Sequence, residues 1–474
     1  MNDFFGHRLD LRSIGLFRIC LAAILIVDLF YYRLNFYDIF YSNEGFLDHS
    51  LWQTMIHEGQ DLWIWNWSLF SSFEGAWFAV LVILLCILSA VFFGIGIWPR
   101  FWGTVLLIGY FSLLQRNPLI TSTHERLLIV FLIFALVLPV EKMFCYKSKK
   151  SGEEIFSYEY RGIPVVVFLL YMSLFYFLNA FLKDGESWAG GEAIRFAIKG
   201  NLHIKPWVSH LSIIDSWLNN LTFFIRGFEF SLAALLLLPS KKAWPQVIAA
   251  FLILLFHWFL FLFFSFGIFP LILSLTSVLL IPGVFWDLIY KKLKIVTRRM
   301  LPPLKATPIT IGFSIFILSL TVWRLSSRSK ALAPYIPAPG LIRALEYTPI
   351  FPLEWPLYAP EVSSAPGWVR LKGTTLKNQQ VDIWSGKNYD PTSQDLSAYQ
   401  VAPWQQFIRI SFIQHSSYKD ILAQGWLRFE FQKWNSLHPK QQLKGIYLVR
   451  FEEDLRQPLS PPRVSNLAQY TPKN

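Results

Sequence analysis

Long apolar runs separated by short polar connectors dominate the first two-thirds of the chain. A bilayer core about 30 Å thick requires roughly 20 mostly apolar residues to be crossed by an α-helix. This pattern predicts about nine spans, at residues 13–33, 75–97, 102–116, 126–141, 162–182, 221–239, 245–265, 268–285 and 308–325. The very short connection before the eighth run predicts a tight helical hairpin. We therefore expect an all-α polytopic membrane bundle over residues 1–327.

A shorter apolar stretch, Asp61–Phe73, is too short to cross a bilayer as a helix. It carries three tryptophans at alternate positions, Trp63, Trp65 and Trp67. Tryptophan favours the headgroup region of a membrane. The stretch is therefore interpreted as a helix lying in the interface.

The pattern changes beyond residue 328, where proline-rich segments are followed by short alternating stretches typical of strands. The alternation predicts strands at Gly367–Lys372, Val381–Trp384, Phe407–Phe412 and Gly445–Glu452. A helix is expected at Lys419–Lys433, and a loose tail from Gln457. Residues 328–474 are thus expected to form a small α+β or β-rich domain outside the membrane.

Composition agrees with a membrane protein, since 54% of the 474 residues are hydrophobic and only 16% are charged, against about 25% in soluble domains. The net charge of +12 does not indicate nucleic-acid binding, because the positive side chains collect in connectors between apolar runs. Every second connector is basic, whereas residues 34–74 contain no Lys or Arg. The positive-inside rule then places the N-terminus in the cytoplasm, and nine spans place the C-terminal domain outside it.

Ionisable residues inside spans are costly and are treated as functional-site hypotheses. Arg18 and Asp28 lie ten residues apart in the first run, so each needs a partner elsewhere. Arg226 and Glu229 are three residues apart on one helix, and the simplest interpretation is that they pair with each other. His257 lies in the middle of an apolar run, where structural and functional interpretations are equally open.

Lys183 ends the fifth predicted span and is followed by Asp184 and Trp188. A lysine at a span end usually extends its amine to the interface. An amine kept from water loses its proton more readily, however, and can act as a base. His124, near Arg116 and Asn117 before the fourth span, has the ordinary interpretation of an interfacial polar residue. No residue spacing indicates a metal site.

Four stretches in register resemble the horizontally transferred transmembrane domain (HTTM) family, which includes vitamin K-dependent γ-carboxylase. They are Asp10–Asp28, Tyr176–Gly191 with its Y-F, lysine and tryptophan, Phe256–Pro270 with F-H and a Gly-x-Phe-Pro turn, and Pro352–Lys372. Together these stretches extend from the first span to the segment that follows the membrane domain.

The resemblance implies a bacterial inner-membrane enzyme in which Lys183 deprotonates reduced vitamin K or menaquinol, assisted by His124 and His257. It further implies a quinone site that includes Arg116, Asn117, Trp188 and Glu229. Dioxygen would form the epoxide, and carbon dioxide would be used if a glutamate-bearing protein substrate is carboxylated. Membrane lipid and quinone are the other partners implied; no nucleic acid is expected.

The chain also departs from the carboxylase pattern. Leu260 and Phe261 stand where polar residues follow the F-H pair, and Ser122 and Thr123 replace asparagines. The C-terminal domain is too short for the animal enzyme's substrate-binding region. Epoxidation or other quinone chemistry is therefore favoured over protein carboxylation. The alternative is a non-catalytic HTTM protein for lipid or quinone binding, immunity or assembly.

Overall fold

The fold is described from a computed structural model of the chain. The described residues run from 7 to 472, except 44, 60–67, 74, 147–157, 201–202, 211–214, 239–243, 295–303, 306, 310, 313, 317–318, 320–357, 392–400, 414–417 and 458–459. Trp63, Trp65 and Trp67, and most of the predicted span at 308–325, lie outside these residues.

The described part of the chain contains five helices that are long and apolar enough to cross a membrane, not nine. They are Leu11–Phe40, Ala76–Ile95 (α4), Ile163–Phe181 (α7), Ser216–Leu237 within α10 (Asp215–Leu237), and Trp244–Phe263 (α11). A sixth is possible if α12 (Phe269–Leu279) and α13 (Gly283–Lys292) form one span, but they are bent by 82° at the break between them. The first helix combines α1 (Leu11–Val27) with a π-helical turn and further short turns.

The third and fourth predicted spans are helices that do not meet the length and hydropathy expected of a span. They correspond to α5 (Pro99–Arg116) and α6 (Thr123–Val137), and α6 has only 15 residues. Side chains on every face of α6 are buried, from Leu127 through Ala135. Its apolar sequence is therefore explained by its central place in the helix packing.

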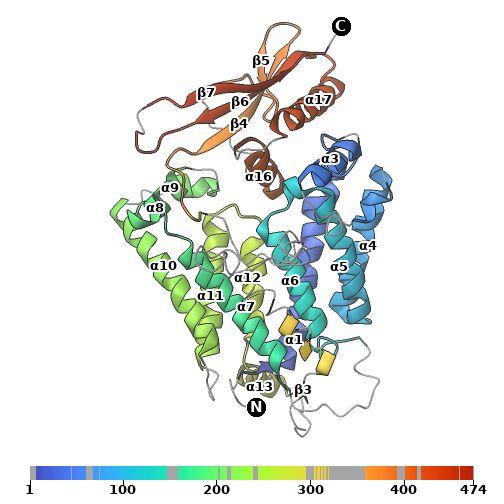
Figure 1. Ribbon diagram of the computed structural model, residues 1–474, viewed down its shortest axis with the longest axis vertical. Helices are drawn as coiled ribbons and strands as arrows, with labels where there is room; N and C mark the ends of the chain where they lie inside the picture. Colours follow the sequence, from blue (N-terminus) through green and yellow to red (C-terminus); the bar gives the residue numbers. More distant parts are fainter. Residues whose placement is uncertain are drawn as a thin grey trace.

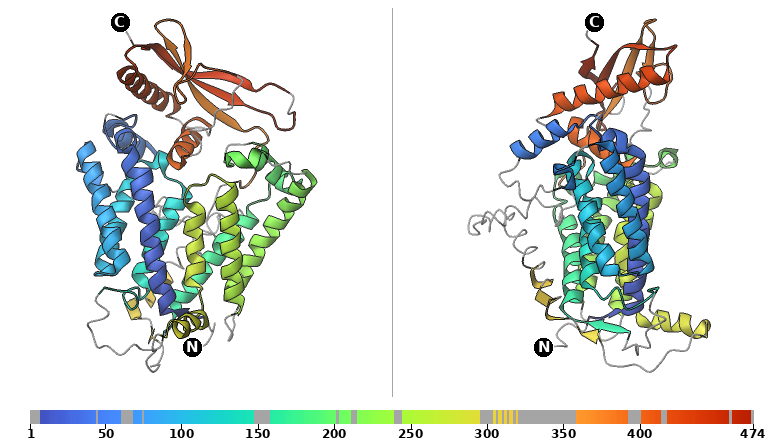
Figure 2. Two further views of the ribbon diagram at one scale, coloured as in Figure 1. Left: turned by 180° about the vertical axis from the view of Figure 1, so that it is seen from behind. Right: turned by 90° about the vertical axis from the view of Figure 1, so that its right-hand side faces the viewer.

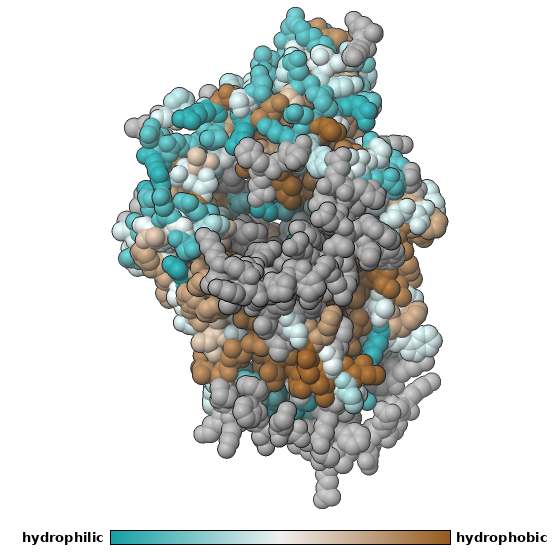
Figure 3. All heavy atoms as spheres, viewed as in Figure 1, coloured by the Kyte–Doolittle hydropathy of each residue, from teal (hydrophilic) through white to brown (hydrophobic). Residues whose placement is uncertain are grey.

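Packing between helices that are distant in sequence builds the bundle. Helix α1 packs against α4 and α12, α7 against α10, and α11 against α12 (Figures 1 and 2). Outward-facing side chains on α4 and α11 are apolar and exposed, including Leu81, Leu88, Phe251 and Leu255. Brown apolar atoms gather over the helical part in Figure 3, whereas teal polar atoms gather over the C-terminal domain.

A small sheet joins three distant segments at the N-terminal end of the bundle. Strand β1 (Leu9–Asp10) pairs with β2 (Glu159–Arg161), and β2 pairs with β3 (Leu304–Lys305). The C-terminal domain lies at the opposite end of the helices (Figure 1). Basic connectors containing Arg161 and Lys305 are thus held together at the end away from the C-terminal domain.

The C-terminal domain contains a four-stranded antiparallel sheet in the order β5-β4-β6-β7. The strands are β4 (Gly367–Thr375), β5 (Gln380–Asp382), β6 (Leu443–Glu452) and β7 (Arg463–Tyr470), and α17 (Lys419–Leu437) packs on β6 and β7. Strand β7 corrects the prediction of a loose tail after Gln457. It is the edge strand, and its ladder to β6 supplies order that its polar sequence does not indicate.

The predicted strand at Phe407–Phe412 is helical instead. These residues end α16 (Ala402–Ile408) and form a π-helical turn, Arg409–Ile413. Their apolar side chains meet Trp426 of α17: the ring centroids of Phe407 and Phe412 lie 5.2 and 5.5 Å from that of Trp426. Tertiary packing on one buried tryptophan therefore decided the local structure.

Helix α16 connects the sheet to the helical bundle (Figure 1). The Trp404 ring lies 5.1 Å from the ring of Phe40, measured between centroids, and Gln405 donates from Nε2 to the carbonyl of Ser265 at 3.0 Å. Gln406 also donates to the carbonyl of Thr121 at 3.1 Å. These contacts join the C-terminal domain to three separate parts of the bundle.

Candidate functional site

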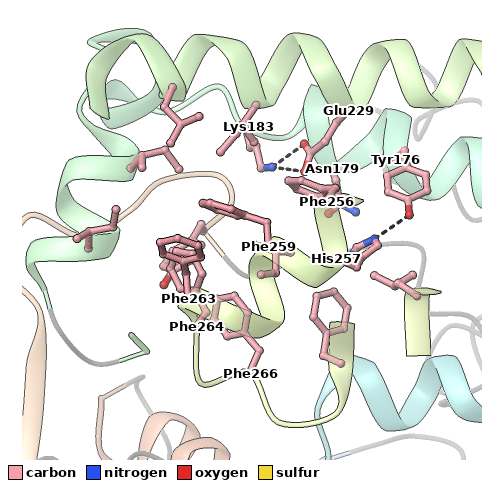
Figure 4. Close-up of a pocket in the computed structure, with 18 of the residues that line it drawn as sticks. Tyr176, Asn179, Lys183, Glu229, Phe256, His257, Phe259, Phe263, Phe264 and Phe266 are labelled. Atoms are coloured by element: carbon pink, nitrogen blue, oxygen red, sulfur yellow. Dashed lines mark hydrogen bonds and ion pairs between the residues drawn. The ribbon is translucent and has the colours of Figure 1, made fainter. Parts of the chain in front are cut away.

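An apolar cavity lies between α7, α10 and α11, near the bundle end that faces the C-terminal domain (Figure 4). Its volume is about 80 Å³, several times the roughly 10–15 Å³ that one water molecule needs. Aromatic side chains form much of the wall, namely Phe175, Phe256, Phe259, Phe263, Phe264, Phe266, Phe269 and Trp188. Such a wall suits a flat apolar ligand.

A buried ion pair lies at this wall. Lys183 Nζ donates to both carboxylate oxygens of Glu229, at 2.6 and 2.5 Å. The two side chains are only 7% and 8% exposed. The ammonium also lies 4.9 Å from the centroid of the Trp188 ring, within the range of a cation–π interaction. Lys183 is thus kept from bulk solvent, and its positive charge is balanced locally.

Helix geometry explains why Lys183 reaches the cavity. Tyr176, Asn179 and Lys183 are spaced three and four residues apart, which places them on one face of α7 and its last turn. Helix α7 ends at Phe181, and Lys183 follows its C-cap, Leu182. The lysine therefore turns towards α10, where Glu229 stands.

The partner of Glu229 differs from the one expected from sequence. The predicted Arg226–Glu229 pair within α10 is wrong, because Glu229 binds Lys183 across 46 residues. Arg226 instead donates from Nε to the carbonyl of Ala180 at 3.1 Å. Both α10 side chains thus contact the end of α7: Glu229 pairs with the Lys183 ammonium, and Arg226 donates to a backbone carbonyl.

Three polar atoms of cavity-lining residues have no hydrogen-bond partner among the described residues. His257 bonds through Nε2 to the Tyr176 hydroxyl at 2.8 Å, but its Nδ1 is unpartnered. Asn179 donates from Nδ2 to the Phe175 carbonyl, while its Oδ1 is unpartnered, as is the Tyr358 hydroxyl. Buried polar groups normally find partners. The cavity therefore offers hydrogen-bonding positions to a ligand.

Tyr358 was not identified from the sequence, although it lies in the Pro352–Lys372 stretch that resembles the family. Hydrogen bonds to two of its backbone carbonyls hold this segment against helix α8 (Glu186–Ala189): Trp188 donates from its side-chain Nε1 to the Tyr358 carbonyl at 2.6 Å, and Gly185 donates from its amide to the Pro360 carbonyl at 3.0 Å. No periodicity or motif marks such a long-range contact. The C-terminal segment thus closes one side of the cavity.

Four of the seven residues implied by the resemblance line this cavity: Lys183, His257, Trp188 and Glu229. The other three are not among its lining residues. His124 bonds to the Ser122 hydroxyl and lies 3.2 Å from Glu125, Arg116 donates to the Leu47 carbonyl at 2.9 Å, and Asn117 donates to the Phe40 carbonyl at 2.8 Å. Each of the three has bonds that explain it structurally.

A separate buried charge cluster accounts for the polar groups of the first helix. Arg33 donates to Asp28 at 3.2 Å and to Glu125 at 2.6 Å, and Tyr110 donates to Asp28 at 2.8 Å. Arg18 donates instead to backbone carbonyls, including Val140 at 2.5 Å. His124 belongs to this cluster through Glu125, not to the surroundings of Lys183.

The cavity combines a buried amine, a carboxylate, an imidazole and a phenol within aromatic walls. Within the described residues, no group of three or more His, Cys, Asp or Glu side chains could hold a metal ion. The available chemistry is proton transfer and hydrogen bonding to an apolar, flat ligand.

Comparison with known proteins identifies no relative: no family model, no curated protein and no solved structure matches this chain. The HTTM resemblance consequently stays a prediction from the four sequence stretches.

Proposed function

We propose that this protein is a membrane-embedded enzyme that binds a reduced quinone, such as menaquinol or reduced vitamin K, and deprotonates it with Lys183. The observation that carries the proposal is an amine buried at the wall of an aromatic cavity, with a carboxylate on one side and unpartnered polar atoms nearby. The five long apolar helices support a membrane location, where such a lipid-soluble ligand would be available.

The Lys183–Glu229 pair provides a route for the proton. Transfer of one proton from the ammonium to the carboxylate leaves a neutral amine and a neutral acid, so that no charge remains buried in this second state of the pair. The amine then accepts the hydroxyl proton of the quinol, so that an O–H bond breaks as an N–H bond forms. The quinolate that results lies beside an ammonium, which stabilises its negative charge.

His257 and Asn179 serve to orient the ring in this proposal. His257 Nδ1 and Asn179 Oδ1, which have no hydrogen-bond partner in the part of the chain that the structure describes, can bond to ring hydroxyl groups. Addition of dioxygen to the quinolate, and use of carbon dioxide on a glutamate-bearing protein, are implied only by the family resemblance. The bacterial inner membrane, with the N-terminus in the cytoplasm, is the location that this proposal includes.

The test measures oxygen-dependent loss of reduced menaquinone by the purified protein. Replacement Lys183→Ala should lower turnover by about 100-fold or more, the usual range for loss of a general base. Lys291→Ala, at an exposed site in α13, is the matched control and should retain activity. Lys183→Ala leaves the Glu229 carboxylate buried without a counterion. The double variant Lys183→Met/Glu229→Gln removes both charges, so it should be inactive without an unpaired charge in the cavity. Unchanged turnover in both Lys183 variants would refute the proposal.

A second candidate function is binding without chemistry. It is favoured by one observation: Lys183 donates to both oxygens of Glu229, as a structural ion pair between helices does. In that case the purified protein would carry quinone absorbance but show no turnover, and Lys183→Met/Glu229→Gln would retain the bound quinone.

A further inference from the structure

A second cavity, of about 180 Å³, lies where the helical bundle meets the C-terminal domain. Its walls come from three separate segments: the region from Phe196 to His203, residues 358–367, and the helical segment containing Gln405 and Arg409. Tyr358 lines both this cavity and the aromatic one. The two cavities are thus neighbours with one wall in common.

The second cavity contains a positive charge, Arg409, that is not paired with a carboxylate of any described residue. Arg409 donates from Nε and Nη2 to the neutral amide oxygen Oε1 of Gln406, at 3.3 and 2.9 Å, and forms no ion pair with any described residue. Burial lowers the pKa of Arg409, because no counterion compensates its charge there. Glu361 is the only acidic residue among the described residues that line this cavity, and it is exposed to solvent. The guanidinium is half-buried, and a charge that is partly removed from water is stabilised by a paired anion.

Two neutral polar groups accompany this charge. His203 Nδ1 and the Tyr358 hydroxyl are buried without hydrogen-bond partners among the described residues, and the two rings lie 6.4 Å apart between centroids. Burial, and secondarily the charge of Arg409, lowers the pKa of His203 to about 4, so this imidazole is neutral at pH 7. These three side chains therefore contribute one positive charge and two hydrogen-bonding groups to the cavity.

We propose that this cavity is a binding site for a small monovalent oxyanion, such as a carboxylate, which pairs with Arg409 and accepts hydrogen bonds from His203 and Tyr358. A guanidinium presents donors in a geometry that matches two oxygens of one group. A single positive charge matches a monoanion better than phosphate dianion. Because the cavity lies at the junction with the polar C-terminal domain, the anion enters from water, unlike the ligand of the aromatic cavity.

The test is isothermal titration calorimetry of the full-length protein in detergent, with acetate, benzoate and inorganic phosphate as separate probes and no quinone present. Saturable binding of a carboxylate is expected, and Arg409→Gln should weaken it roughly tenfold or more, as loss of a charge-assisted hydrogen bond does. Arg463→Gln, on the exposed part of β7, removes the same charge elsewhere in the domain and should leave binding unchanged. Binding of benzoate without acetate would indicate that the carboxylate belongs to a larger ligand.

Two further variants keep the test decisive if Arg409→Gln fails to fold. Tyr358→Phe and His203→Asn retain Arg409 and should each weaken carboxylate binding by a few-fold, the usual effect of losing one neutral hydrogen bond. Absence of saturable carboxylate binding by the unmodified protein, or equal affinity in all these variants, would overturn the proposal. Neither result bears on quinol turnover, which depends on Lys183.

Discussion

Removal of the Glu229 carboxylate should destabilise the fold through the charge that it leaves behind. In Glu229→Gln the Lys183 ammonium stays in a cavity of aromatic side chains, where a neutral amide oxygen and the ring of Trp188 at 4.9 Å can interact with it but no negative charge balances it. Both partners are more than 90% buried, so solvent cannot replace the lost carboxylate. Breaking a buried pair by removing one partner costs about 3–5 kcal/mol. We expect the free energy of unfolding to fall by that amount.

The double variant Lys183→Met/Glu229→Leu should recover this loss. Replacing both charges with apolar groups of similar size is often neutral, or stabilising by about 1–4 kcal/mol. A double-mutant cycle therefore separates the cost of an unpaired charge from that of altered packing. The measurement is chemical unfolding in detergent micelles, followed by tryptophan fluorescence.

A surface pair provides the control for this cycle. Arg450 and Glu452 lie 3.0 Å apart, and their side chains are 27% and 35% exposed. Glu452→Gln should therefore cost less than about 1 kcal/mol. The reasoning is refuted if Glu229→Gln lowers the free energy of unfolding no more than Glu452→Gln does, and if the effects of substituting Lys183 and Glu229 are additive. The Lys183–Glu229 pair would then not be held away from water.

Two further predictions concern groups outside the aromatic cavity. Arg33→Met should lower the free energy of unfolding by about 3–5 kcal/mol, because it leaves two buried carboxylates, Asp28 and Glu125, without their cation. Glu125→Gln should lower it by only about 1–3 kcal/mol, since Arg33 still pairs with Asp28. Equal losses of unfolding free energy in the two variants would contradict this. For His203, the folded-state pKa of about 4 lies below the unfolded value of 6.5, so its contribution to stability is complete above pH 6.5 and is lost as the pH falls towards 4. Relative to His203→Asn, the unmodified protein should lose at most about 3 kcal/mol over that interval, measured as unfolding free energy against pH; parallel curves would count against the burial of this imidazole.

Sequence patterns predicted the local structure well where apolar residues form a long run or recur at a regular spacing. The apolar runs at 75–97, 162–182 and 245–265 correspond closely to α4, α7 and α11. The helix expected at Lys419–Lys433 and the strand at Gly445–Glu452 are also present. The pattern was wrong for Phe407–Phe412, where aromatic residues support a strand in isolation but pack on Trp426 as a helix.

Span number could not be decided from hydrophobicity alone. A helix such as α6 is apolar because other helices surround it, and an apolar sequence does not distinguish a protein neighbour from a lipid one. The bend of 82° between α12 and α13 likewise has no marker in the hydrophobic pattern, since the apolar run continues up to the break.

By itself, the sequence determined that apolar helices precede a polar C-terminal domain, and it identified Lys183 and His257 as unusual within their apolar surroundings. These properties depend on each residue's near neighbours along the chain. Only the tertiary structure decided that Glu229 neutralises Lys183, that Tyr358 separates two cavities, and that Arg409 has no carboxylate among the described residues. Such contacts join segments from 46 to 170 residues apart. Their energies depend on distance and burial in three dimensions, which no local pattern records.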